Sequence, residues 1–338
     1  MDISKTSAQP KEMEQRHLGT TGLISAALGL GCMGFSQAYG PADDDRSTAA
    51  IRTALDQGVT MIDTAMSYGR GHNEKLIARA IAGRRQDVVL ATKFGIVRRD
   101  DGVGLDGRPE HVRAYCDASL GRLGVDTIDL YYLHRVDPEV PVADTVGAMA
   151  ELVVEGKVRH LGLSEVNPGQ LEQAVAVHPI AAVQFEWSLS WREPEDDVVP
   201  AARRLGVGLV PYSPLGRGLL TGALPTGPFP AGDFRSGDPR FATENLHGNL
   251  ALVQALGHLA AQRQVTVGQL ALAWLLAQGP DVVPIPGTRN PARIAENTAA
   301  AEVTLSAADL AALERAAPRQ SWQGNRQSFA AHGTSRSR

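Results

Sequence analysis

Apolar and polar residues follow two alternating periods along most of this chain. Short apolar runs, typical of buried strands, alternate with longer segments whose apolar residues recur at helical spacing. This strand-then-helix alternation predicts an α/β protein, and specifically a parallel (β/α)8 barrel rather than an open sheet. The expected strands are 26–30, 59–63, 87–92, 127–133, 158–163, 182–185, 208–212 and 282–285. The expected helices are 43–57, 72–82, 109–123, 142–155, 168–177, 195–205, 267–278 and 291–300.

Several segments fall outside this alternation. Residues 17–24 hold two glycine-containing turns, which suit a short hairpin closing the barrel floor. Residues 98–108 and 225–247 are expected to form long loops, and long loops at the catalytic face of a barrel usually set specificity. The domain organisation that we expect is an N-terminal tail (1–15), one barrel domain (16–317) with extra helices after the seventh strand and at the C-terminus, and a C-terminal tail (318–338).

Composition places the chain among ordinary globular enzymes. Of its 338 residues, 43% are hydrophobic and 21% are charged, and the net charge of −4 gives no indication of a nucleic-acid partner. The two cysteines, Cys32 and Cys116, are too few for a disulfide framework and fit a reducing cytoplasm. The polar first residues lack the apolar core of a signal peptide, and no apolar run is long enough to cross a bilayer. We expect a cytoplasmic protein without a metal site.

Three consecutive predicted strands end in an ionisable residue. Asp63 ends one run, Lys93 follows the next, and His134 follows the third, while Tyr68 lies on the loop just after Asp63. The carboxyl ends of barrel strands converge on one face, so these four side chains are expected to meet there. Each residue alone has an ordinary structural explanation, such as a cap or a packed aromatic. The repetition over three strands favours a catalytic site.

These motifs resemble a known family. Asp63-Thr-Ala-x-x-Tyr68-Gly, Ala-Thr-Lys93 and Leu-His134 are similar to the catalytic tetrad of the aldo-keto reductases, and the resemblance covers roughly residues 16 to 315. The chain looks most like the pyridoxal reductase and perakine reductase branch. The resemblance implies that the protein reduces an aldehyde or ketone of a small molecule, with a nicotinamide cofactor as the hydride source.

The chemistry of the four residues fits carbonyl reduction. Tyrosine is a poor acid at neutral pH because its usual pKa is about 10. An ammonium nearby stabilises phenolate, so Lys93 should lower the pKa of Tyr68, and Asp63 should keep Lys93 charged. His134 can donate a hydrogen bond that orients the substrate carbonyl. Tyr68 is therefore the expected general acid, and Tyr68 and His134 are the expected substrate contacts.

Residues 29–34 spell GxGxxG, which by itself would suggest a Rossmann dinucleotide site. That site needs a helix at the third glycine, whereas the following residues include Gly40-Pro41 and three aspartates. We interpret the segment as the first barrel strand turning into the catalytic face. By resemblance, Cys32 and Met33 lie near the nicotinamide ribose. Asn73, which follows the catalytic loop, is expected to cap a helix.

The resemblance assigns further cofactor contacts at the later strand ends. Ser164 and Gln184 are expected to hold the carboxamide, although Glu165 replaces the family's asparagine, and Trp187 is expected to stack on the nicotinamide. The segments after strands seven and eight carry Gly, hydroxyl and guanidinium groups that suit pyrophosphate and a 2′-phosphate, which favours NADP(H) over NAD(H). The expected cofactor-binding residues are Cys32, Met33, Asp63, Ser164, Gln184, Trp187, Ser213, Leu215, Arg217, Gly287, Thr288, Arg289, Arg293, Glu296 and Asn297.

Two alternative functions stay open from the residues. One is a non-catalytic, nucleotide-bearing binding subunit similar to the β subunits of potassium channels, which share these residues. The other is a Schiff-base aldolase that uses Lys93 as its nucleophile. The sequence does not identify the substrate, the direction of the reaction in the cell or the oligomeric state.

Overall fold

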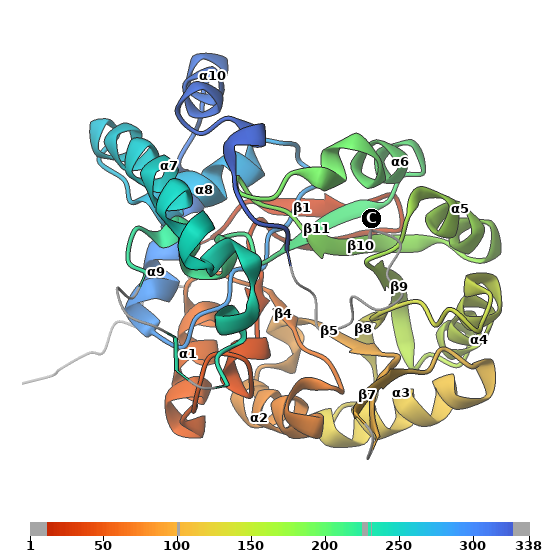
Figure 1. The fold of residues 1–338 in the computed structure, drawn as a ribbon. Helices are drawn as coiled ribbons and strands as arrows, with labels where there is room; N and C mark the ends of the chain where they lie inside the picture. The colour runs from red at the N-terminus through yellow and green to blue at the C-terminus, as the bar shows by residue number, and fades with distance from the viewer. Residues whose placement is uncertain (1–11, 100–101, 225–228, 231, 327–338) are drawn as a thin grey trace, which may run out of the picture.

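Seven parallel strands form the central sheet of the structure, which is a computed structural model that describes residues 12–99, 102–224, 229–230 and 232–326. Neighbouring strands follow the chain order, which confirms the predicted (β/α)8 barrel (Figure 1). The strands are β3 (Leu30–Gly31), β4 (Met61–Asp63), β5 (Val89–Phe94), β8 (Ile128–Leu133), β9 (Val158–Ser164), β10 (Ile180–Glu186) and β11 (Gly208–Tyr212).

The segment 282–286 closes the barrel in the place of an eighth strand. Val283 N donates to Leu209 O at 2.8 Å on one side, and Gly29 N donates to Pro284 O at 2.9 Å on the other. The pairing amounts to an isolated bridge rather than the predicted strand. The physical reason is that Pro284 and Pro286 have no N–H group, so a continuous ladder cannot form.

Helices surround the barrel in the order in which they follow the strands (Figure 1). Their bounds agree with the predicted helices to within a few residues, except that the predicted helix 195–205 is divided into a 3-10 turn, Glu193–Asp196, and a shorter α-helix. The helices are α1 (Asp44–Asp56), α2 (His72–Ile81), α3 (Pro109–Leu123), α4 (Val142–Val154), α5 (Pro168–Val177), α6 (Val198–Arg204), α8 (Val267–Leu276) and α9 (Pro291–Ala299).

The N-terminal hairpin lies across the amino-terminal ends of the strands. Strands β1 (Gln15–Leu18) and β2 (Leu23–Ala26) pair antiparallel, as predicted. Gly19 has φ of +66°, and a Cβ there would lie 2.3 Å from the carbonyl oxygen of Gly206, so only glycine permits this approach. Most of the predicted tail 1–15 lies outside the described residues.

Two regions expected to be loops contain regular structure. Of the predicted loop 98–108, residues 98–99 and 102–105 belong to an antiparallel pair of β6 (Ile96–Arg99) and β7 (Gly102–Leu105). After β11, two 3-10 turns, Phe234–Gly237 and Pro239–Phe241, lead into the long helix α7 (Thr243–Gln262). Helix α7 and the C-terminal α10 (Ala307–Ala316) are the extra helices that the fold prediction included.

The barrel interior is apolar at the floor and polar at the top. Residues that point inward are two positions apart along a strand, because successive side chains alternate between the two faces. A buried apolar layer contains Met61, Ala91, Tyr132, Ala182 and Val210. Two residues further along the same strands stand Asp63, Lys93, His134, Gln184 and Tyr212.

Candidate active site

The tetrad predicted from the strand ends is assembled at the top of the barrel. Lys93, fully buried on β5, forms an ion pair with Asp63 on β4 and donates to Thr64 O at 2.8 Å. Its Nζ also lies 3.4 Å from the Tyr68 hydroxyl oxygen. The rings of Tyr68 and His134 meet edge to face with centroids 5.7 Å apart. The phenol therefore lies between an ammonium and an imidazole, as the proposed acid role requires.

The charges in this cluster are set by burial and by the ion pair. Burial disfavours the charged form of Lys93, but the neighbouring Asp63 and Tyr68 outweigh it, and the pKa of Lys93 is raised. Burial also raises the pKa of Tyr68, and Lys93 offsets this only in part. Lys93 thus lowers the pKa of Tyr68 as predicted, but burial has the larger effect and the net pKa is raised. The phenol is protonated at neutral pH and can donate a proton.

His134 is neutral in this environment. Burial, followed by the positive charges of Arg135 and Lys93, lowers its pKa well below the usual value. A neutral imidazole still carries one N–H and can donate it to a substrate oxygen. Arg135, which directly follows His134, donates to the His134 carbonyl oxygen at 2.6 Å and to Ser164 Oγ at 3.0 Å. It couples the end of β8 to the end of β9.

A cavity of about 590 Å³ opens above these residues. That volume is in the range of sites for small molecules and cofactors. Lys93 does not line the cavity, because it lies beneath Tyr68 with no exposed surface. A substrate carbonyl therefore cannot reach its nitrogen, which argues against the Schiff-base aldolase. The predicted site residues that line the cavity are Cys32, Met33, Asp63, Tyr68, His134, Ser164, Gln184, Ser213, Leu215, Arg217, Gly287, Thr288 and Arg289.

The structure corrects the predicted role of Trp187. This side chain is 1% exposed and packs in the core against Phe185 and Trp274, and its Nε1 donates to Glu195 at 2.9 Å. Gln184 points inward to donate to Asp63 Oδ2 at 2.8 Å, so Trp187, three positions later, falls on the opposite face of the chain. At the end of the neighbouring strand β11, the aromatic residue Tyr212 does line the cavity.

The loop after β11 contributes the next wall. Ser213 and Arg217 both have positive φ, 48° and 58°, a conformation that costs side-chain-bearing residues free energy and often occurs at functional sites. The Arg217 guanidinium stacks on the Phe234 ring, 4.1 Å from its centroid, and ion-pairs with Glu186 at 3.4 Å and Asp238 at 3.3 Å. Arg217 is thus held by protein carboxylates at the edge of the cavity.

The segment before α9 presents the remaining predicted cofactor residues differently. Arg289 donates to the carbonyl oxygens of Tyr39 and Gly40 at 2.7 and 3.3 Å, so it holds the 39–41 loop in place. Arg293 is half exposed and ion-pairs with Glu296. Neither Arg293 nor Glu296 lines the large cavity, and Asn297 lines a small crevice beside Thr288. These residues surround the start of α9 rather than the tetrad.

Asn73 is not the helix cap that the sequence suggested. Gly71 occupies the N-cap position of α2, and Asn73 is fully buried inside the first turn. Its amide donates to Cys32 O at 2.9 Å and to Ser36 Oγ at 2.8 Å and accepts from Thr64 Oγ1 at 2.6 Å. Asn73 therefore ties the first strand end to the Asp63 loop, which is a supporting role.

Sequence reasoning missed several residues of the cavity wall. Arg135 and Tyr212 lie at strand ends and could have been found by applying the strand-end rule to every strand. Phe234 and Arg235 come from the loop after β11, and Arg98 comes from the β6–β7 hairpin, where no local pattern indicates the cavity. Within the ranges that the structure describes, no helix is both long and apolar enough to span a membrane.

Comparisons with known proteins agree with this geometry. Residues 27–318 match the model of the aldo/keto reductase family. A Glycine max protein described as probable aldo-keto reductase 1 is 45% identical over 304 residues, which is 89% of this chain and 88% of the relative. The glycerol dehydrogenase AKR11B4 from Gluconobacter oxydans is similar in structure, with a TM-score of 0.84, 30% identity and coverage of 94% and 99% of the two chains.

A further solved structure, an aldo/keto reductase from Klebsiella pneumoniae in complex with NADP and acetate, is 28% identical. It superposes with a TM-score of 0.70 and covers 93% of this chain and 99% of its own. These matches span nearly the whole chain, and they confirm the family suggested by the motifs around Asp63, Lys93 and His134. The chain belongs to the aldo/keto reductase family of oxidoreductases.

Proposed function

We propose that the protein reduces an aldehyde or ketone group of a small molecule to the alcohol with NADPH. The observation that carries the proposal is the assembly of Asp63, Lys93, Tyr68 and His134 at one end of a cavity of about 590 Å³. The Klebsiella pneumoniae relative in complex with NADP supports the cofactor.

The donors around the cavity fit a nicotinamide dinucleotide. Ser164 and Gln184 offer a hydroxyl and an amide to a carboxamide, and Tyr212 offers an aromatic surface in the role first expected of Trp187. Ser213 and Arg217 suit a pyrophosphate, and the start of α9, with Thr288 and Arg293, suits a 2′-phosphate. NADPH, when bound, supplies the hydride to the carbonyl carbon.

The protein's own residues complete the reduction. His134 donates a hydrogen bond to the carbonyl oxygen and orients it. As negative charge develops on that oxygen, Tyr68 transfers its proton to it, so the substrate gains one hydride and one proton and becomes the alcohol. Lys93 stabilises the phenolate that remains, and Asp63 keeps Lys93 charged. Solvent then returns a proton to Tyr68.

The test is a fluorescence titration with NADPH and, in parallel, NADH, followed by an aldehyde and ketone screen. We expect tighter binding of NADPH and consumption of NADPH with at least one carbonyl. Tyr68→Phe should lower kcat by a factor of about 10² to 10⁴, the usual contribution of a general acid, while NADPH binding stays unchanged. Retained turnover in this variant would remove Tyr68 from the mechanism.

We further propose that the chain belongs to the pyridoxal and perakine reductase branch that it resembles, and that its substrate is an aromatic carbonyl compound. Phe234, Tyr39 and Phe35 line the cavity and support an aromatic substrate. A panel of matched aromatic and aliphatic aldehydes tests this point. A lower kcat/KM for the aromatic members would contradict the branch assignment without affecting the proposed reductase activity.

A further inference from the structure

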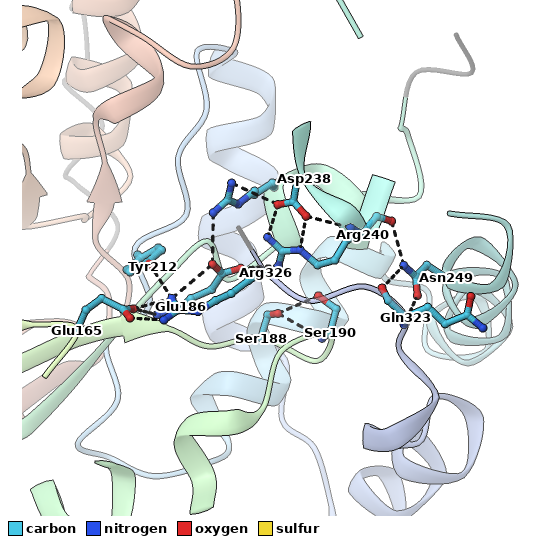
Figure 2. A network of polar contacts seen from close by, with 11 residues as sticks. Glu165, Glu186, Ser188, Ser190, Tyr212, Asp238, Arg240, Asn249, Gln323 and Arg326 are labelled. Atoms are coloured by element: carbon cyan, nitrogen blue, oxygen red, sulfur yellow. Dashed lines mark hydrogen bonds and ion pairs between the residues drawn. The ribbon is translucent and has the colours of Figure 1, made fainter. Parts of the chain in front are cut away.

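A buried cluster of six charges lies behind the cavity wall. It contains three carboxylates and three guanidiniums, so its charges balance, and Figure 2 shows it as a connected network around Glu186 and Arg326. Every member that these ion pairs join is buried or nearly so. The carboxylates are Glu165, Glu186 and Asp238, and the guanidiniums are Arg217, Arg240 and Arg326.

Arg326 is the member that comes from the C-terminal end of the described chain. Its guanidinium binds both carboxylate oxygens of Glu165, one of them at 2.8 Å, and donates to the Tyr212 hydroxyl at 3.0 Å. It also lies 3.9 Å from a carboxylate oxygen of Glu186, and its side chain is only 7% exposed. A single side chain thus contacts the ends of β9, β10 and β11 at once.

The segment that carries Arg326, residues 318–326, is attached along its length, and we call it the C-terminal strap. Arg319 pairs with Asp196. Gln323 N donates to Asn249 Oδ1 at 2.9 Å, and Asn249 returns a bond to Gln323 O at 3.0 Å. Figure 1 shows the strap in dark blue, descending from α10 past α7. The contacts of Arg319 and Gln323 therefore hold the strap in place on the way to Arg326, which contacts Glu165.

One member of this cluster, Arg217, and one residue next to it, Tyr212, face the cavity. Tyr212 and Arg217 both line it, whereas Glu165, Glu186 and Arg326 do not. Glu165 itself has φ of +57°, an unfavourable conformation for a residue with a side chain, so it needs external contacts to stay in place. Without Arg326, Glu165 would be a buried carboxylate with its principal cation removed, directly behind Tyr212.

We propose that Arg326 is a positioning residue for the cofactor, which it serves by neutralising Glu165 and fixing Tyr212 against the nicotinamide end of the cavity. Because Glu165 is neutralised, the cluster has no excess negative charge that would pull the Arg217 guanidinium away from the cavity. Arg217 therefore keeps its ion pairs with Glu186 and Asp238 while it lines the cavity. This inference rests on the proposed use of NADPH. It assigns to the C-terminal strap a part in cofactor affinity rather than in proton transfer.

The experiment compares Arg326→Met with the double variant Glu165→Gln/Arg326→Met in the full-length protein. NADPH dissociation constants come from fluorescence titration, and KM and kcat come from turnover with one carbonyl substrate. Arg203→Met is the matched control, because Arg203 also forms a two-point pair with a carboxylate, Asp281, at 2.9 and 3.1 Å, near the opposite end of β11.

We expect Arg326→Met to raise the Kd and KM for NADPH by about tenfold or more, while kcat at saturating NADPH changes by less than about threefold. Adding Glu165→Gln should restore the Kd to within about threefold of the parent, because the buried negative charge is removed together with the cation that neutralised it. A merely structural defect would lower the active fraction, and hence kcat, and the second substitution would not rescue cofactor affinity.

An unchanged Kd in Arg326→Met, or a double variant that binds as poorly as the single one, would overturn the inference. If Arg326→Met does not fold, Arg326→Gln takes its place, since its amide keeps a donor for Glu165 and Tyr212 without the charge. The same Kd criterion then applies. Parent protein that binds no NADPH would overturn the proposed function and this inference together, whereas failure in the variants alone would leave the proposed function standing.

Discussion

At the scale of single residues, Lys93 supplies the positive charge of the proposed catalytic cluster. It is fully buried, pairs with Asp63 and lies 3.4 Å from the Tyr68 hydroxyl. Burial raises the pKa of Tyr68 and Lys93 lowers it, with burial prevailing. Reduction needs the protonated phenol, so its rate should be level at neutral pH and should fall as pH rises through the pKa of Tyr68.

The first prediction follows from the direction in which Lys93 changes the pKa of Tyr68. Lys93→Met removes the cation that lowers the pKa of Tyr68, so the alkaline fall in kcat/KM for the carbonyl should move to higher pH, although kcat itself drops. Profiles from about pH 6 to about pH 11 at saturating NADPH would show the shift as an onset of the fall at higher pH. Lys157→Met is the control, because Lys157 forms a surface ion pair with Asp117, and it should leave the pH of the alkaline fall unchanged. If the alkaline fall in kcat/KM stays at the same pH or moves to lower pH in Lys93→Met, then Lys93 does not lower the pKa of Tyr68.

At the scale of elements, two arginines at the start of α9 have different contacts. Arg289 donates to backbone carbonyls of the 39–41 loop and so shapes the cavity wall, while Arg293 is half exposed and forms an ion pair with the neighbouring Glu296. A change in the cavity wall should affect NADH and NADPH alike, whereas a 2′-phosphate is present only in NADP(H). The two side chains should therefore affect cofactor choice differently.

We predict that Arg293→Met raises the Kd for NADPH about tenfold and leaves the Kd for NADH unchanged. Arg289→Met should weaken both cofactors to a similar degree, because it releases the loop. Parallel titrations of the two variants with the two cofactors would measure this. Equal weakening of NADH and NADPH by Arg293→Met would show that Arg293 does not recognise the 2′-phosphate.

At the scale of the whole molecule, the N-terminal hairpin holds the barrel closed. Arg16 on β1 is 8% exposed, and its guanidinium donates to the carbonyl oxygens of Leu276, Gly279 and Val282 at 3.2, 2.9 and 2.8 Å. These carbonyls lie where the chain leaves α8 and enters the closing segment 282–286. The Arg16 side chain thus joins β1, the first strand of the chain, to the segment 282–286 that closes the barrel.

Arg16→Met should therefore lower the free energy of unfolding by about 2 to 3 kcal/mol, since the buried carbonyls of Leu276 and Val282 lose a charged donor. Urea denaturation would measure the loss, and kcat should stay the same because the tetrad lies at the other end of the barrel. Arg204→Met, which breaks an exposed pair with Glu172, should cost less than about 1 kcal/mol. Equal costs for the two variants would contradict the closing role of Arg16.

Local sequence determined the elements and the tetrad of this protein. Apolar periodicity reports which positions are buried within one strand or helix, and Asp63, Lys93 and His134 stand at strand ends that any parallel barrel brings together. The N-terminal hairpin was equally readable from its glycine turns. For these features, the information lies within a few neighbouring residues.

Other features were decided only by tertiary structure. Trp187 and Tyr212 are both aromatic residues near a strand end, and the phase of strand alternation turned Trp187 into the core and Tyr212 into the cavity. The meeting of Arg326 with Glu165 joins positions far apart in the chain, and no local pattern encodes such a pair. Sequence periodicity fixes the face on which a side chain lies, whereas its partner depends on how distant elements pack.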